Sequence, residues 1–130
     1  METPQDRKYA KTHEWAKPEG DVVRVGLSDY AQDQLGDIVF IELPKTGQDV
    51  TQGEAMGVIE SVKAVADLNA PVSGEVVAVN EALTDQVELV NEDPYGEAWM
   101  VTIRPSAPAE YEGLMDVASY ARHCEEDEGK

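Results

Sequence analysis

The chain has 130 residues, of which 27 are acidic and 10 are basic, so its formal net charge at pH 7 is −17. This charge repels phosphate groups, which argues against nucleic acid and against an anionic membrane surface as partners. Hydrophobic residues make up 42% of the chain, which is enough for one modest core. We therefore expect a monomer with a single domain over residues 1–130, its core at about 8–124 and an acidic tail at 125–130.

No targeting or membrane segment is predicted. The stretch Met1–Arg7 has no apolar run behind basic residues, and no part of the chain approaches ~18 consecutive apolar residues. We therefore expect a cytoplasmic protein. The one cysteine, Cys124, excludes an intramolecular disulfide and a cysteine-based metal site, as is usual in a reducing compartment.

The N-terminal part of the chain predicts two strands and a short helix. The strands are Trp15–Lys17 and Val22–Val25, which flank a turn at Pro18–Asp21. Ser28 is a suitable N-cap for a helix that ends near Gly36.

The central part predicts a buried strand followed by a hairpin. Near-continuous apolarity at Ile38–Leu43 indicates a strand covered on both faces. Two further apolar runs, Ala55–Ile59 and Val65–Leu68, are separated only by Glu60–Ala64. That spacing is typical of a β-hairpin.

The C-terminal part predicts two more strands, after which the spacing of apolar residues changes to that of a helix. The strands are Val76–Val79 and Trp99–Ile103, with a loop at Asn91–Gly96 between them. Apolar residues then recur at i, i+3, i+4 and i+7, which predicts one amphipathic helix from about Ala109 to Arg122. The charge run Cys124–Lys130 is expected to fray.

Motifs of catalysis and of metal binding are missing from the sequence. It contains no Gly-rich phosphate loop and no serine nucleophile elbow. His13 and His123 are the only histidines and fall in different segments, so no metal site is predicted.

Lys63 stands out because it falls at the tip of the predicted hairpin. A lysine on a rigid stalk suits the attachment of a prosthetic group that must leave one site and enter another. Periodicity alone, however, favours an ordinary solvated lysine in a turn.

The residues around Lys63 carry a resemblance to known proteins. Glu60-Ser61-Val62-Lys63-Ala64 resembles the lipoyl-attachment hairpin, and the chain from about Lys8 to Cys124 is similar to the H proteins of the glycine cleavage system. The matching stretches are Thr12–Trp15, Asp29–Phe40, Glu42–Pro44, Ala70–Val76, Leu89–Asn91, Asp93–Gly96 and Trp99–Met100.

This resemblance implies a mainly β fold, a barrel-sandwich hybrid of two small antiparallel sheets with short peripheral helices and a C-terminal helix. It implies a carrier without catalysis of its own, with lipoate in amide linkage to Lys63. The implied partners are glycine decarboxylase, which is a pyridoxal-phosphate enzyme, aminomethyltransferase, dihydrolipoyl dehydrogenase, and a lipoate ligase or lipoyl/octanoyl transferase. The strong acidity fits docking on basic surfaces of these enzymes, although solubility explains it almost as well.

The resemblance also assigns roles to single residues. Glu60 is implied in recognition by the lipoate-attaching enzyme, and Glu14 and Asp67 are implied in lining a cleft for the loaded arm, near Thr12 and His13. Acidic side chains there favour the ammonium form of an aminomethyl group, and a closed cleft keeps water from it. Glu14, Asp67 and Glu60 are also compatible with ordinary surface charges, and His13 with a structural role.

Three alternative functions remain open at this level. An H-like protein could donate lipoate to other proteins as a relay, while keeping the same lysine hairpin. A biotin carrier is disfavoured, because Val62 and Ala64 stand where biotin carriers have methionines. An acidic interaction protein without a cofactor predicts that Lys63→Arg changes nothing.

Overall fold

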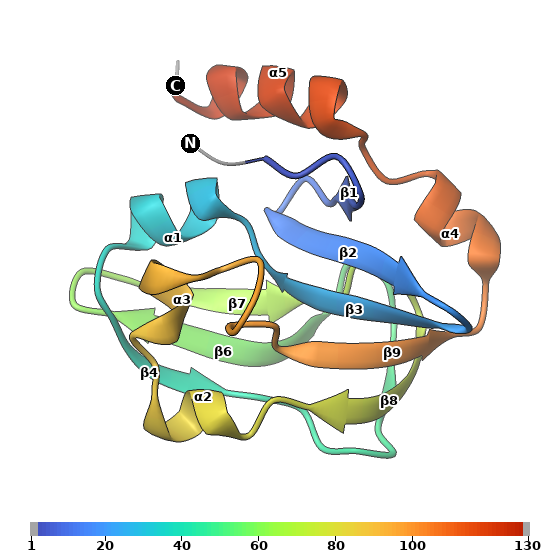
Figure 1. The fold of residues 1–130 in the computed structure, drawn as a ribbon, viewed down its shortest axis with the longest axis horizontal. Helices are drawn as coiled ribbons and strands as arrows, with labels where there is room; N and C mark the ends of the chain where they lie inside the picture. The colour runs from blue at the N-terminus through green and yellow to red at the C-terminus, as the bar shows by residue number, and fades with distance from the viewer. Residues whose placement is uncertain (1–2, 129–130) are drawn as a thin grey trace.

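Nine strands form two antiparallel sheets in residues 3–128, the part of the chain that the computed structural model describes (Figure 1). The six-stranded sheet has the order β1 (Lys8–Tyr9), β2 (Glu14–Glu19), β3 (Val22–Leu27), β9 (Val101–Pro105), β8 (Gly74–Val79) and β5 (Asp49–Val50). The three-stranded sheet has the order β4 (Ile38–Glu42), β6 (Ala55–Ser61) and β7 (Val65–Asn69). This arrangement confirms the expected mainly β class with two antiparallel sheets.

Short helices and one longer C-terminal helix lie outside the sheets (Figure 1). They are α1 (Asp29–Leu35), α2 (Ala82–Asp85), α3 (Leu89–Glu92), α4 (Pro108–Glu112) and α5 (Val117–Glu128). Helix α5 packs on the N-terminal segment, where the rings of Tyr120 and Tyr9 stack with their centroids 4.4 Å apart. Among residues 3–128, no helix is both long and apolar enough to cross a membrane.

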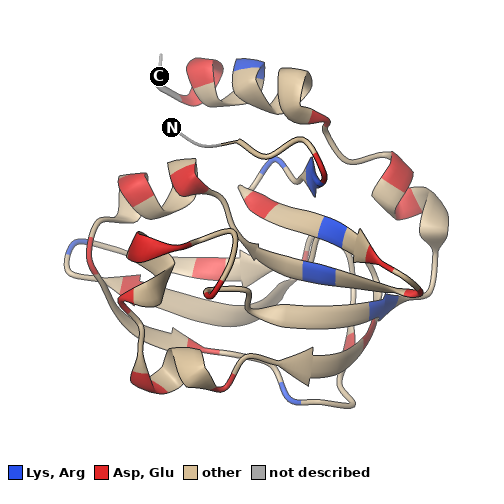
Figure 2. Ribbon diagram, viewed as in Figure 1, with Lys and Arg blue, Asp and Glu red and all other residues tan. Residues whose placement is uncertain are grey.

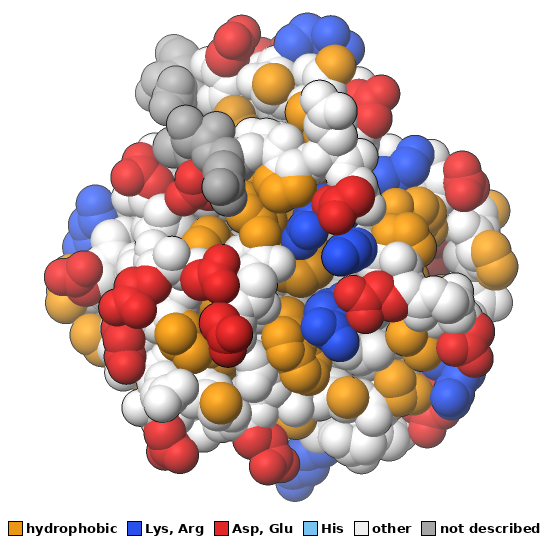
Figure 3. Space-filling view, in the orientation of Figure 1, with side chains coloured by type: hydrophobic (Ala, Val, Ile, Leu, Met, Phe, Trp, Pro, Cys, Tyr) orange, Lys and Arg blue, Asp and Glu red, His pale blue; other side chains and the backbone are white. Residues whose placement is uncertain are grey.

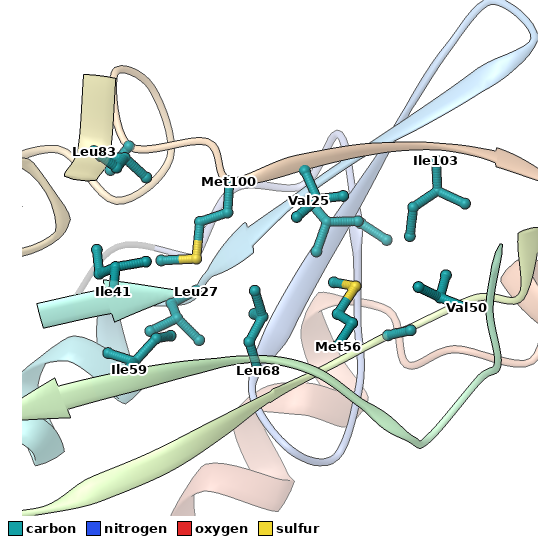
Figure 4. Close-up of a cluster of buried hydrophobic side chains, with 14 of the residues drawn as sticks. Val25, Leu27, Ile41, Val50, Met56, Ile59, Leu68, Leu83, Met100 and Ile103 are labelled. Carbon is teal, nitrogen blue, oxygen red and sulfur yellow. The ribbon is translucent and has the colours of Figure 1, made fainter. Parts of the chain in front are cut away.

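The main hydrophobic core lies between the two sheets (Figure 4). In β3 the inward positions Val23, Val25 and Leu27 are buried, as the two-residue period of a strand requires. Side chains of both sheets meet there with helix and loop residues; those labelled in Figure 4 are Val25, Leu27, Ile41, Val50, Met56, Ile59, Leu68, Leu83, Met100 and Ile103.

The helix start and the hairpin are as predicted. The Ser28 hydroxyl accepts a hydrogen bond from the Ala31 N–H at 3.1 Å, and α1 ends before Gly36. Strands β6 and β7 pair antiparallel with Glu60 opposite Val65.

The prediction that the Ile38–Leu43 strand is covered on both faces was wrong. Ile38 and Ile41 of β4 are buried, but the side chains of Val39 and Phe40 are 54% and 47% exposed. The reason is that the small sheet turns only one face to the core, and a β-bulge between Ile38 and Phe40 interrupts the alternation, so that two consecutive side chains stay exposed.

The single helix predicted from Ala109 to Arg122 was also wrong. The chain forms two helices, α4 and α5, because the segment between them pairs with strand β1 instead of continuing the helix. The backbone of Met115 bridges to Tyr9, with hydrogen bonds of 2.8 and 2.9 Å in the two directions. Helix α5 then continues to Glu128, beyond the start of the tail expected to fray; residues 129–130 lie outside the described part.

Two predicted connections are shorter than expected. Strand β2 continues through Pro18 and Glu19, and Pro18 lies opposite Val23 of β3, so the turn is confined to Gly20 and Asp21. The predicted loop at Asn91–Gly96 loses its first two residues to α3.

Replacing Gly26 by alanine should destabilise the fold by about 3 kcal/mol, at the upper end of the usual cost of overpacking. Gly26 lies opposite Trp15 in the β2–β3 pair, and a Cβ atom there would lie 2.6 Å from Cζ2 of the Trp15 ring. That ring has little room to move, because it is buried and its indole N–H donates to the Pro94 carbonyl at 3.0 Å. Urea unfolding would measure the loss.

Gly113→Ala is the matched control for this prediction. Gly113 has an ordinary φ of −81°, and the nearest atom to an added Cβ is 3.7 Å away. Equal unfolding free energies for the two variants would contradict the packing argument.

Candidate functional site

Lys63 lies at the exposed tip of the β6–β7 hairpin, as predicted. The Ser61 hydroxyl oxygen accepts the backbone N–H groups of Lys63 and Ala64 at 3.3 and 3.0 Å, and the Ser61 N–H donates to the Ala64 carbonyl at 2.8 Å. The Val62 N–H donates to the Asp37 carbonyl at 3.0 Å, which ties the tip to the start of β4. The lysine therefore stands on an ordered turn while its own side chain faces solvent.

The stem of Lys63 lies against the end of α1. A Cβ atom added to Gly36 would lie 3.1 Å from Cε of Lys63. Gly36 has a φ of +77°, which favours glycine, and its N–H closes α1 by donating to the Gln32 carbonyl at 2.9 Å. The preceding residue, Leu35, lines a cavity described below, so the end of the lysine side chain lies near the wall of that cavity.

Glu60 lies in a cross-strand row on the outer face of the small sheet. Phe40 of β4 and Val65 of β7 are its partners on the two sides, and their side chains are 47% and 68% exposed. Val62, at the tip, is also exposed. The carboxylate of Glu60 therefore lies between two exposed apolar side chains on this face.

A cavity of about 360 Å³ lies between α1, β7, the turn before β2 and the end of α5. Its lining residues are Thr12, His13, Leu27, Tyr30, Ala31, Gln34, Leu35, Ala66, Asp67 and Asp127. The structure thus brings Thr12, His13 and Asp67, three of the four predicted cleft residues, to one cavity. Its polar wall carries two carboxylates, and a cationic group would be stabilised there.

Glu14, the fourth predicted cleft residue, lies one layer deeper. Its side chain is buried, does not line the cavity, and accepts hydrogen bonds from the Thr12 hydroxyl and from the Asn69 N–H at 3.0 Å. Burial raises the pKa of Glu14 to about 7, although these hydrogen bonds oppose the shift. The carboxyl group therefore joins β2 to β7 and supports the cavity wall through Thr12.

His13 belongs to a chain of hydrogen bonds. Its Nε2 lies 2.8 Å from Asp127 Oδ2, its Nδ1 lies 2.7 Å from the Tyr120 hydroxyl, and that hydroxyl lies 2.6 Å from Ser28 Oγ. Burial lowers the pKa of His13, and Asp127 opposes the shift. With a neutral ring and an ionised Asp127, Nε2–H donates to the carboxylate, Nδ1 accepts from Tyr120 and Tyr120 accepts from Ser28.

Asp127 and Gln34 were not predicted as cleft residues. Asp127 falls in the acidic run that was read as a solvated tail, but its place four residues after His123 on a continued helix puts both side chains on one face. That spacing is the signal that could have found Asp127. Gln34 lies one turn after Tyr30 on α1, and only the packing of α1 shows that this face meets the cavity.

A larger cavity, of about 510 Å³, lies on the other side of Thr12, between the N-terminal segment and the loop after α4. Its wall includes Tyr9, Pro71 and Met115 but, among the described residues, no acidic side chain. It offers little to a cationic group, and the acidic cavity beside Lys63 is the better candidate site.

The charge distribution agrees with this placement. Figure 2 shows the basic tip of the β6–β7 loop against acidic segments of α1 and β7. On the face drawn in Figure 3, acidic side chains gather over α1 and α3. The lysine is thus a positive charge at the edge of a largely negative surface.

Comparisons with known proteins agree with this arrangement. The family model "Glycine cleavage H-protein" matches residues 7–127. The chain is 52% identical over 128 residues to the glycine cleavage system H protein of Anaeromyxobacter sp. (strain K), covering 98% of this chain and 100% of that protein. It is 54% identical over 120 residues to a glycine cleavage system H protein of Thermus thermophilus, covering 92% of this chain and 94% of that protein.

A solved structure has a similar fold. The crystal structure of a glycine cleavage system H protein from Mycobacterium marinum matches with a TM-score of 0.85 and 40% sequence identity, covering 92% of this chain and 97% of that one. The family match, the identities over nearly the whole chain and the shared fold lead to one conclusion: the chain belongs to the glycine cleavage H-protein family.

Proposed function

We propose that this chain is the lipoyl-bearing carrier of the glycine cleavage system, with lipoate joined as an amide to Nζ of Lys63. The observation that carries the proposal is an exposed lysine on an ordered hairpin tip, inside the stretch Glu60–Ala64, in a member of the H-protein family. The site fits the group, because the Lys63 side chain is exposed and its end lies near the wall of an acidic cavity.

The chain's own residues would hold and protect the loaded arm. When bound, lipoate supplies a disulfide that takes up the aminomethyl group of glycine and is later returned as a dithiol. Asp67 and Asp127 would hold the ammonium charge, and Leu27 and Leu35 would reduce the access of water. Thr12 and His13 complete the polar wall, and Glu14 supports it from behind.

The surfaces around the site suit several successive partners. We propose the row Phe40, Glu60 and Val65 as the contact for the lipoate ligase or lipoyl/octanoyl transferase, because it flanks Lys63. Glycine decarboxylase, aminomethyltransferase and dihydrolipoyl dehydrogenase would meet the same tip and its acidic surroundings, which favour basic docking surfaces. In this role the chain is a carrier subunit that catalyses none of the steps itself. A monomeric single domain and a cytoplasmic location stay predictions.

A reconstituted reaction tests the proposal. The chain is lipoylated by a purified ligase and mixed with glycine, tetrahydrofolate, NAD⁺ and the three enzymes, and release of CO₂ from glycine is followed. We expect release that depends on the lipoylated chain and that the unlipoylated chain does not support.

The outcomes separate the proposed carrier from its alternatives. A lipoylated chain that supports no CO₂ release, beside an active control H protein, would leave only the lipoate-relay function. A chain that the ligase does not modify, while it modifies the control, would remove the lipoyl carrier altogether.

A further inference from the structure

The fold brings the only two histidines of the chain together with a carboxylate. His13 and His123 fall in different segments of the sequence, which predicted no metal site, yet their ring nitrogens and a carboxylate oxygen of Asp127 all lie within 4.8 Å of one another. His123 and Asp127 are four residues apart on α5 and therefore share one face of the helix. His13 approaches from the turn before β2.

The distances are close to those of a metal centre. Nε2 of His13 and Nε2 of His123 lie 2.8 and 3.6 Å from Oδ2 of Asp127. Ligand atoms bound at about 2.0–2.2 Å to a tetrahedral zinc ion lie about 3.4 Å from one another. The 3.6 Å separation already fits, and the 2.8 Å separation must widen by roughly half an ångström. The nitrogens of the two histidines lie within 4.8 Å of each other and must approach by up to about 1.4 Å. The two rings are stacked with their centroids 5.3 Å apart, so binding requires both imidazoles to rotate toward the ion.

The surroundings orient His13 for this role. Its backbone has a φ of +77°, which is rare outside glycine and costs free energy, so the rest of the fold holds the residue there. Its Nδ1 is hydrogen-bonded to Tyr120, and Tyr120 to Ser28. Both hydroxyls can donate or accept, so the chain of hydrogen bonds can reverse: Nδ1–H then donates to Tyr120, Tyr120 donates to Ser28, and Nε2 presents its lone pair. Metal-binding histidines usually have such a partner on the second nitrogen.

We propose that His13, His123 and Asp127 bind one divalent transition-metal ion of the zinc class, with a water in the fourth position. Two imidazoles and a carboxylate suit Zn²⁺ and Co²⁺, whereas Mg²⁺ and Ca²⁺ prefer oxygen ligands. The three side chains are 16%, 24% and 27% exposed, so an ion can enter. His123 would give up its hydrogen bond to the Lys11 carbonyl, 2.7 Å long.

The ion would link two parts of the fold. It would join α5 to the turn before β2, and it would lie at the edge of the acidic cavity, because His13 and Asp127 also line that cavity. The overall charge of −17 attracts cations to the protein. The proposal needs no lipoyl group, but it shares His13 and Asp127 with the cavity proposed for the loaded arm, so a bound ion would leave Asp67 as the acidic side chain that faces the ammonium group.

Metal titration of the full, unlipoylated chain tests the site. After treatment with a chelator that is then removed, Zn²⁺ affinity and stoichiometry are measured in competition with a chromophoric chelator, and Co²⁺ is added separately to record its visible absorption. We expect one Zn²⁺ per chain, unaffected by excess Mg²⁺, and the strong visible bands of tetrahedral Co²⁺. His123→Gln and Asp127→Asn should each weaken Zn²⁺ binding at least about tenfold.

Two matched variants complete the design. Glu126→Gln makes the same charge change as Asp127→Asn on an exposed neighbouring position, and Cys124→Ser removes the one thiol of the chain. Both should bind Zn²⁺ like the unchanged chain. Absence of binding, equal weakening by Glu126→Gln, or loss of binding in Cys124→Ser would each overturn the proposal. Far-ultraviolet circular dichroism of His123→Gln, which removes a partly exposed side chain, verifies that its fold is kept.

Discussion

A Lys63→Arg chain should keep its fold and accept no lipoyl group. The guanidinium of arginine stays protonated and offers no free amine for an amide bond. Lys63 is exposed at the hairpin tip, and the hydrogen bonds there are made by its backbone and by Ser61, so the free energy of unfolding should change by less than about 0.5 kcal/mol. Intact mass after incubation with lipoate, ATP and a lipoate ligase should show one added lipoyl group on the unchanged chain and none on the variant.

Lys45→Arg is the control for this experiment, because Lys45 is also an exposed lysine in a turn but lies outside the Glu60–Ala64 stretch. It should be lipoylated like the unchanged chain. A lipoyl group found on Lys63→Arg, or lost from Lys45→Arg, would place the attachment elsewhere. Unchanged support of glycine decarboxylation by Lys63→Arg would contradict the carrier mechanism as a whole.

A Glu14→Gln chain should lose a pH dependence of stability that the unchanged chain has. Burial raises the pKa of Glu14 from the ordinary value of 4.5 to about 7. Between these two values the folded chain binds more protons than the unfolded chain, so its stability falls as the pH rises through this range. The shift corresponds to a loss of about 3 kcal/mol between pH 4.5 and pH 7.

Urea unfolding of both chains at several pH values between 4.5 and 8 measures this difference. Glutamine keeps the shape of the side chain, can accept from the Asn69 N–H and can donate to Thr12, but it does not titrate. The unfolding free energy of Glu14→Gln relative to the unchanged chain should therefore rise with pH. Subtracting the two curves cancels the repulsion among the other acidic groups.

Glu42→Gln removes the same charge from an exposed position of β4 and should leave the pH dependence as it is. Parallel curves for the unchanged chain and Glu14→Gln would show that the pKa of Glu14 is the same in the folded and the unfolded chain. The hydrogen bonds to the carboxylate would then offset the effect of burial.

The predictions that the structure confirms were based on short-range sequence patterns. Ser28 caps α1 through its own side chain, three residues from the group it binds, and Gly36 ends the helix because a positive φ favours glycine there. The β6–β7 hairpin follows from two apolar runs with a short connection, which puts Lys63 at the tip. Each of these features depends on residues that are neighbours in the chain.

Which face of a strand is buried, and where a predicted helix is interrupted, could be seen only in the tertiary structure. The apolar pattern of β4 does not say that Val39 and Phe40 are both exposed, since that depends on the sheet that β4 joins and on the β-bulge in its pairing with β6. The apolar spacing between Tyr111 and Ala118 fits a helix, but Met115 instead pairs with Tyr9, because an unpaired strand edge competes for its backbone groups.

The sequence by itself determined the hairpin lysine, the resemblance that implies a lipoyl group on it, and the predominance of β-structure. Only the tertiary structure decided that Glu14 is buried behind Thr12, and that Asp127 joins His13 at the cavity. The physical reason is that burial, pKa and side-chain contacts depend on residues far apart in the chain, whose approach is set by the packing of α1, β7 and α5 rather than by any local pattern.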